Sequence, residues 1–383
     1  MIAEGICRLR RGQVERRPGY DGEYGTISLF EPWEMDEVEG QMSLFLPSKW
    51  GLPEQRADNG PRMQGVQASD FGRGETEEAD MPFCLEKLNE AQRKAAMTPA
   101  PAIAVTAGPG TGKTGTLTAR ILCLLKDRGV KPSEITAVTF TNKAAAELRV
   151  RLEGQAGAKR ALRLLNTGTF HSICLKLLQE QGFDRIPASE EMLLELAGDA
   201  VKETGLDCTA AEFLRKLSLI KSRGGRNVLS GNEAGEKAED PEAGFQKAAA
   251  RYEESLEAEG ACDFDDLLLE TLKLLKQEKK EEIRRRRFSY LLVDEFQDVN
   301  PVQFQLIQAW NKGQKELFVI GDPDQAIYGF RGSDPGCFEA LRREYPGLTQ
   351  IALSENYRSV PSVLEGAQAL ISMNPAGREN CIL

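Results

Sequence analysis

The chain has 383 residues, of which 41% are hydrophobic and 28% are charged, and its formal net charge is −10. This length predicts two or three domains, at roughly 150 residues per domain, and the acidic balance argues against a polycation that coats nucleic acid, although a local basic groove stays open. The charge is uneven, because 9 basic and 16 acidic residues precede residue 83.

Cysteine and histidine usage bounds the chemistry further. The eight cysteines are scattered without a CxxC pair, and His171 is the only histidine, so a zinc site is not expected. No signal-peptide pattern is present, and no apolar run reaches the roughly 18 residues that a membrane span requires. We therefore expect a reducing, cytoplasmic setting in which the cysteines are ordinary core residues.

Residues 1–82 are rich in Gly, Pro, Asp and Glu and lack helical periodicity, which is typical of a flexible arm or linker. Within them, Gln13–Arg17 and Thr26–Phe30 flank the turn-rich stretch PGYDGEYG, and this arrangement predicts a hairpin. The hairpin could be the tail of an upstream domain.

A second feature of the arm is Gln41-Met42-Ser43-Leu44-Phe45. It resembles the pentapeptide with which bacterial proteins dock on the replication sliding clamp. In that mode Gln41 would hydrogen-bond at the pocket edge, while Leu44 and Phe45 would fill an apolar pocket. The alternatives are a chance match in a short window and simple tethering of the arm to the core.

The folded part begins near Phe83, and its central motif is Ala102–Thr114, AIAVTAGPGTGKT. An apolar run ends in a loop of the form GxxxxGK[ST]. After the loop, the apolar residues within Leu117–Leu125 recur at helical spacing. The loop consists of Gly108, Pro109, Gly110, Thr111, Gly112, Lys113 and Thr114. Its glycines let backbone N–H groups face one anion, Lys113 would reach the β- and γ-phosphates, and Thr114 would bind Mg²⁺. The alternative is a glycine-rich turn without function.

Two further strand-to-helix junctions follow the loop. Ile135–Phe140 predicts a strand that ends in Thr139 and Phe140, and a helix starts near Asn142. Thr167–Ser172, which contains His171, repeats this pattern. Polar residues at such junctions usually cap helices, but a large phenylalanine is less expected there.

Residues 186–259 interrupt the alternation of strands and helices, and their spacing predicts a helical insert. Thr209 and Glu212 form a capping-box pattern, and Ser222–Gly244 is expected to be a loop. Asp263–Leu268, DFDDLL, returns the chain to the main core.

The stretch Phe288–Asp298, FSYLLVDEFQD, predicts a strand buried on both faces. It ends in Asp294 and Glu295, at the strand end where open α/β sheets bind ligands. Asp294 can hold Mg²⁺ and Glu295 can polarise an attacking water, as phosphoryl transfer requires. The alternative is an exposed acidic turn.

The last informative segments are Glu316–Asp322, another strand, and SENYRS at Ser354–Ser359. After the strand, Gln325 is placed to sense a γ-phosphate, and Arg358 could reach it as an arginine finger does. Tyr328, Phe330 and Arg331 set aromatic rings beside a cation, which suits the stacking of unpaired bases. The alternative, which these residues by themselves favour, is that Tyr328 and Phe330 pack in the core.

Eight motifs now stand in order: LNEAQ, AGPGTGKT, TFTNKAA, TFHS, DFDDLL, LLVDEFQD, VIGDPDQAIYGFRG and LSENYRS. This order resembles the UvrD/Rep/PcrA helicases of superfamily 1 over about residues 83–383. The resemblance implies an α/β fold with a RecA-like P-loop NTPase parallel sheet (residues 83–185 and 260–352), a helical insert subdomain (186–259) and the truncated start of a second RecA-like domain (353–383).

The resemblance also implies ATP-driven, 3′-to-5′ movement on single-stranded DNA, with 3′-tailed duplex DNA as a substrate, in repair or replication. ATP and Mg²⁺ would be the cofactors. Gln92 would read adenine and Tyr357 would stack on it, while Lys113, Thr114, Asp294, Glu295, Gln325 and Arg358 would handle phosphates, metal and water. Thr139, Phe140, Asn142, His171, Tyr328, Phe330 and Arg331 would contact the DNA strand.

The sequence departs from the family pattern at several places. Gly115 stands where the family usually has arginine, Phe330 replaces a common tryptophan, and the later motifs of a second domain are absent. We therefore expect an amino-terminal helicase half that binds ATP but hydrolyses it weakly. The alternatives are a non-motor ATP- and DNA-binding module that needs a partner, and a helicase-like subunit of a nuclease complex. Some such helicases follow a metal-dependent PHP nuclease domain, and the residues before Gln41 could be the end of such a domain.

Overall fold

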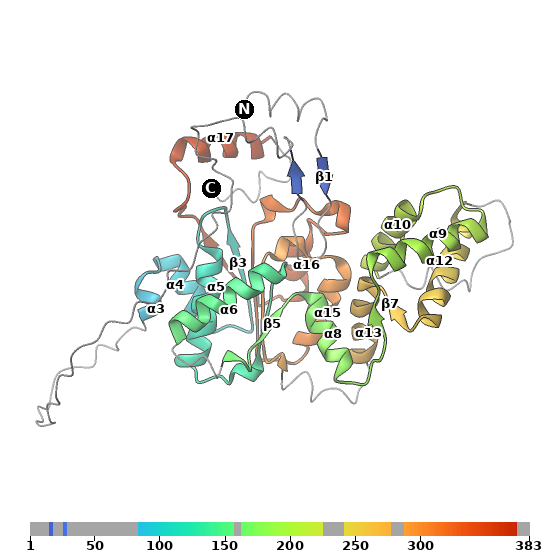
Figure 1. Ribbon diagram of the computed structural model, residues 1–383. Coiled ribbons are helices and arrows are strands. Elements are labelled where there is room, and N and C mark those ends of the chain that lie inside the picture. The colour runs from blue at the N-terminus through green and yellow to red at the C-terminus, as the bar shows by residue number, and fades with distance from the viewer. Residues whose placement is uncertain are drawn as a thin grey trace, which may run out of the picture. The chain divides into compact units, whose positions relative to one another are not determined.

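The computed structural model describes residues 15–17, 26–28, 83–156, 162–224, 241–276 and 287–373 (Figure 1). The chain divides into two units, the first of which holds β1 (Glu15–Arg17) and β2 (Thr26–Ser28). These strands pair antiparallel, with Arg16 opposite Ile27, which confirms the predicted hairpin pairing. The clamp-like pentapeptide at residues 41–45 lies outside the described residues and stays a prediction.

A six-stranded parallel sheet forms the centre of the second unit, in the order β10-β3-β9-β8-β4-β5 (Figure 1). Its strands are β3 (Ala102–Ala107), β4 (Ile135–Val138), β5 (Asn166–Gly168), β8 (Tyr290–Val293), β9 (Glu316–Gly321) and β10 (Thr349–Leu353). Continuous apolar runs such as that of β9 suit a parallel sheet covered on both faces. The predicted α/β fold class is confirmed.

Helices cover both faces of this sheet, and alternate residues of each strand serve the two sides. Phe318 and Ile320 of β9 pack into one core cluster, while Leu317 and Val319 pack into the other. The first cluster includes residues of α4 (Glu90–Met97), α5 (Lys113–Lys126) and α6 (Asn142–Ala156). The second includes residues of α8 (Phe170–Gln179), α13 (Phe264–Lys276), α15 (Pro301–Asn311) and α16 (Cys337–Glu344).

Short elements complete the second unit. They are α3 (Phe83–Glu86), η1 (Pro132–Glu134), η3 (Phe296–Asp298), η4 (Pro323–Gln325), η5 (Gly329–Arg331) and α17 (Pro361–Ile371). Cys123, Cys174, Cys262 and Cys337 are free and buried, as expected of core cysteines. Among the described helices, none has the length and apolar character that crossing a membrane would demand.

The helical insert consists of α9 (Glu190–Thr204), α10 (Ala210–Ser222) and α12 (Pro241–Ala258), with a core of its own that contains Phe213 and Tyr252. The predicted capping box at Thr209 is confirmed. The short parallel pair β6 (Ile186–Pro187) and β7 (Ala261–Cys262) joins its two ends. The predicted loop is wrong at residues 241–244, which open α12, because proline suits the first turn of a helix.

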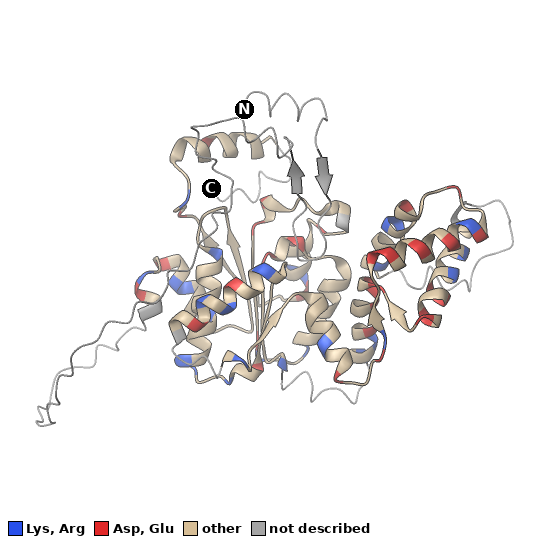
Figure 2. Ribbon diagram, viewed as in Figure 1, with Lys and Arg blue, Asp and Glu red and all other residues tan. Residues whose placement is uncertain are grey.

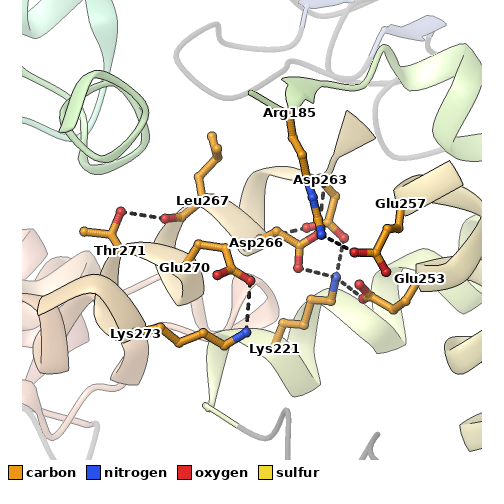
Figure 3. Close-up of polar contacts among 10 residues, drawn as sticks. All are labelled: Arg185, Lys221, Glu253, Glu257, Asp263, Asp266, Leu267, Glu270, Thr271 and Lys273. Atoms are coloured by element: carbon orange, nitrogen blue, oxygen red, sulfur yellow. Dashed lines mark hydrogen bonds and ion pairs between the residues drawn. The ribbon is translucent and has the colours of Figure 1, made fainter. Parts of the chain in front are cut away.

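A buried ion cluster links the insert to α13, as Figure 3 shows. Lys221 of α10 is fully buried, and its Nζ lies 2.6 Å from Asp263 Oδ2, 3.0 Å from Asp266 Oδ1 and within ion-pair distance of Glu253. Burial by itself would lower the pKa of Lys221, but the three carboxylates outweigh it and raise the pKa. The ammonium therefore stays charged and is the counterion of the carboxylates.

We predict that Lys221→Met lowers the free energy of unfolding by about 3–5 kcal/mol, because it leaves buried carboxylates without their cation. Lys273→Met is the matched control, since Lys273 is 57% exposed and pairs with Glu270 on the same helix. We expect this control to change stability by no more than about 0.5 kcal/mol. Denaturant unfolding followed by circular dichroism measures both variants, and equal midpoints would contradict an anchoring role.

Candidate nucleotide and strand sites

The loop between β3 and α5 has the backbone of an anion cradle. Gly110 and Gly112 have φ angles of 72° and 84°, in the left-handed region. A Cβ at Gly112 would lie 2.6 Å from Gln92 Nε2, and one at Gly110 would lie 2.6 Å from Arg358 Cβ. Only glycine fits both positions, and the loop ends at the N-terminus of α5, where backbone N–H groups attract phosphate.

A pocket of about 520 Å³ lies over this loop. Ten predicted nucleotide residues line it: Gly108, Pro109, Gly110, Gly112, Lys113, Thr114, Glu295, Gln325, Tyr357 and Arg358. The segment after β10 is held on the loop, because the Tyr357 N–H donates to Gly110 O at 3.0 Å and the Asn356 side chain donates to Pro109 O. Residues more than 240 positions apart thus form one pocket.

Three of the residues predicted to bind the nucleotide do not line this pocket. Gln92 is 6% exposed, its Nε2 donates to Thr111 O at 2.8 Å, and its Oε1 accepts from Asn89 N at 3.1 Å. The amide therefore braces the loop in this structure. Thr111 is buried, with its hydroxyl on Gly108 O. Asp294 follows β8 and donates its backbone N–H to Val138 O at 2.9 Å.

Several buried carboxyl groups lie at this edge of the sheet, and their pKa values are raised. Burial, and then the charge of Glu295, raise the pKa of Asp294 to about 7. The same two causes raise the pKa of Asp298 to about 7, and burial raises the pKa of Asp322. Lys113 lies 3.8 Å from Glu295 Oε2 and opposes all three shifts. An oxygen-rich site of this kind fits Mg²⁺, which Asp294 and Thr114 would hold.

Glu295 has an unusual backbone. With φ 47° and ψ 48°, it is the one non-glycine residue in the described part of the chain with a positive φ. Such a conformation costs about 1–3 kcal/mol and persists only where the surroundings enforce it. Here the following residue, Phe296, is fully buried against Phe304 and Phe338. The turn aims the Glu295 side chain into the nucleotide pocket.

A second pocket, of about 410 Å³, is lined by aromatic residues. It brings together Phe140, His171, Tyr328 and Phe330, four of the residues predicted to contact the DNA strand. We call it the strand pocket. The ring centroids of Phe140 and Tyr328 lie 5.1 Å apart, and those of Tyr328 and Phe330 lie 5.8 Å apart. Phe330 is 69% exposed, so the row of rings ends at the surface.

The other residues predicted to contact the DNA strand do not line this pocket. Thr139 is 2% exposed, and its hydroxyl donates to Thr141 O. Asn142 is exposed at the start of α6. Arg331 ends η5, and its side chain lies outside the described part of the structure.

The structure adds residues to both pockets that the sequence motifs left without a role. Arg151 of α6 lines the nucleotide pocket beside Gly115, which has open space above it. The strand pocket gains Phe264, Asp265 and Asp298, which lie inside motifs already recognised. It also gains Arg215, Ser218 and Leu219 of the insert, for which no local signal exists.

A parallel sheet with a glycine-cornered loop after one strand and an acidic pair after another defines a P-loop nucleotide-binding domain. The family described as the UvrD/REP helicase N-terminal domain matches residues 88–346, and the chain belongs to this family.

Two relatives illustrate the similarity. The chain is 36% identical over 318 residues to the ATP-dependent DNA helicase UvrD1 of Mycobacterium tuberculosis, covering 77% of this chain and 40% of that protein. It is 32% identical over 309 residues to the ATP-dependent DNA helicase PcrA of Staphylococcus aureus, covering 77% and 41%. The chain thus spans about two fifths of the length of these curated relatives.

We predict that Gly112→Ala destabilises the protein by about 1–3 kcal/mol, because alanine at a positive φ is strained and its Cβ collides with Gln92. Gly154→Ala in α6 is the control, since open space surrounds Gly154 and alanine favours a helix by up to about 1 kcal/mol. Thermal or denaturant unfolding separates the two. A Gly112→Ala protein as stable as the parent would rule out the close approach of Gln92 to the loop.

Proposed function

We propose that this chain is the ATP- and strand-binding part of a DNA helicase that moves 3′ to 5′ along single-stranded DNA in repair or replication. The observation that carries the proposal is the pairing of two pockets: one joins the phosphate loop to Glu295, Gln325 and Arg358, and the other is lined by aromatic rings. The names of the relatives support ATP as the nucleotide and DNA as the strand. Polarity and pathway follow from the family resemblance.

In the nucleotide pocket, each group has a distinct task. Lys113 and the loop N–H groups would bind the β- and γ-phosphates, and Thr114 with Asp294 would hold Mg²⁺. The metal, when bound, neutralises charge on the phosphates. Glu295 orients and polarises the attacking water, Gln325 and Arg358 face the γ-phosphate, and the 62% exposed ring of Tyr357 offers a stacking face for the base.

In the strand pocket, the rings of Phe140, Tyr328 and Phe330 stack on unpaired bases. Acidic and basic residues are interspersed along the helices of the core and the insert (Figure 2). Binding is therefore expected to depend on stacking more than on a polycationic surface. Strand binding that vanishes at moderate salt would favour an electrostatic mode instead.

We predict that the chain binds ATP with Mg²⁺ and that Lys113→Ala lowers this affinity about 10- to 150-fold, because a charge-assisted hydrogen bond contributes about 1.5–3 kcal/mol. Lys126→Ala, at the other end of α5, is the matched control, since Lys126 Nζ donates to Gln155 O. Calorimetric titration with a non-hydrolysable ATP analogue measures both. We expect weak hydrolysis from this stretch alone, because hydrolysis in this family needs a cleft closed between two domains. An unaffected Lys113→Ala variant would remove the nucleotide assignment.

We predict that Tyr328→Ala and Phe330→Ala each weaken binding of a single-stranded oligonucleotide by about 5- to 150-fold, as the loss of one base stack of about 1–3 kcal/mol implies. Met97→Ala, which removes a 44% exposed apolar side chain from α4, should leave the affinity unchanged. Fluorescence anisotropy with a labelled strand, repeated with a 3′-tailed duplex, gives the affinities. Wild-type affinity in both aromatic variants would show that these rings only pack against the core.

A further inference from the structure

Gln297 is a buried amide that touches the machinery of both pockets. Its Nε2 donates to Glu295 Oε2 at 3.0 Å and to Asp298 Oδ2 at 3.2 Å, so each of its two hydrogens meets a different carboxylate. Its Oε1 accepts the backbone N–H of Asp322 at 2.9 Å, just after β9. Gln297 itself is 3% exposed and lines neither pocket.

The fold holds this amide in place from three directions. Gln297 lies in the short helix η3, directly after the strained turn at Glu295. Gly321, the last residue of β9, approaches so closely that a Cβ there would lie 2.5 Å from Gln297 Oε1. Asp322, whose backbone Gln297 holds, accepts a hydrogen bond from Gln325 Nε2 at 2.6 Å. A shift of the Gln297 side chain therefore reaches both Glu295 and the segment that carries Gln325.

The two carboxylates that share the amide face different ligands. Glu295 lines the nucleotide pocket, while Asp298 lines the strand pocket beside Phe140 and Tyr328. Asp298 is 7% exposed, and its Oδ1 accepts no hydrogen bond within the described part of the chain. A buried carboxylate oxygen without a donor is costly, and the N–H groups of a nucleobase are donors that would satisfy it.

We propose that Gln297 couples the two pockets, with a nucleobase N–H at Asp298 as the signal from the strand side. This inference rests on the proposed function. A base that donates to Asp298 Oδ1 draws charge from this carboxylate and weakens the hydrogen bond that Gln297 donates to its Oδ2, so that the bond from Gln297 to Glu295 Oε2 becomes the stronger of the two. Strand binding thereby changes how firmly Glu295 is oriented in the nucleotide pocket. Because coupling between binding sites is reciprocal, nucleotide binding must change strand affinity by the same factor. Gln297 is a positioning residue here, since it touches neither ligand.

The test measures the coupling factor, which is the ratio of the affinities for a non-hydrolysable ATP analogue with Mg²⁺ in the presence and absence of a saturating homothymidine strand. We expect the wild-type chain to show a ratio of about 5- to 150-fold, the usual size of such coupling. Gln297→Met is neutral and similar in size but cannot donate, and we expect its ratio to fall below about 2-fold. The ratio is insensitive to a uniform loss of nucleotide affinity.

Two further variants make the test specific. Asp298→Asn leaves Gln297 intact and keeps one oxygen acceptor, so it should lose the coupling while it stays folded. Gln350→Met is the control, since Gln350 is exposed and its Oε1 accepts from Arg342 Nε, and we expect it to keep the wild-type ratio. Wild-type coupling in Gln297→Met, or a wild-type chain that binds both ligands without coupling, would overturn the inference and leave the proposed function standing. A wild-type chain that binds neither ligand would overturn the proposed function itself.

Discussion

The parallel pairing of β3, β9 and β8 is the constraint on which both pockets depend. In a parallel sheet the loops after all strands leave at one edge. Val105 of β3 lies opposite Ile320 of β9, and Val319 of β9 lies opposite Val293 of β8. This register puts the phosphate loop, the Asp322 segment and the Asp294–Glu295 pair side by side, although they are separated by up to about 210 residues of sequence. No local interaction could bring these groups together.

The same edge concentrates the carboxylates of Asp294, Glu295, Asp298 and Asp322. Burial, and then the charge of Glu295, raise the pKa values of both Asp294 and Asp298 to about 7. Lys113 lies 3.8 Å from Glu295, and Arg151 and Arg358 line the same pocket. The strained backbone at Glu295 is tolerated because the next residue, Phe296, is held in place by its buried ring. Core packing thus maintains a turn that its own dihedral preferences oppose, at a place where charge and strain suit a catalytic role.

The sequence predicts the parts of this site that are local in the chain. Gly108–Thr114 can be recognised because the motif requires its glycines, Lys113 and Thr114 at fixed positions within a few residues. The apolar run before Asp294 predicts a buried strand by itself. The sequence does not predict that Gln92 braces the loop, because the hydrogen bond from Gln92 to Thr111 O depends on how α4 packs against α5. Arg215 enters the strand pocket from the insert, and its position depends on tertiary docking that no spacing rule encodes. The sequence predicts a loop at the start of α12, because the acidic and glycine-rich residues around Pro241 have the composition of a loop.

The attachment of the insert and the shape of the strand pocket depend on the same turn of chain. Asp263 and Asp266, three residues apart at the start of α13, face Lys221. Asp265, between them, lines the strand pocket and accepts a hydrogen bond from Ser218 of α10. Burial raises the pKa of Asp265, and the charges of His171 and Lys221 oppose that shift. Because Lys221 holds α10 against this turn, Ser218 and Arg215 keep their places on the pocket wall. A buried ion cluster stabilises a fold no better than apolar packing would, but its bonds are directional, and here they join α10 to the turn that carries Asp265, so that two walls of the same pocket are connected.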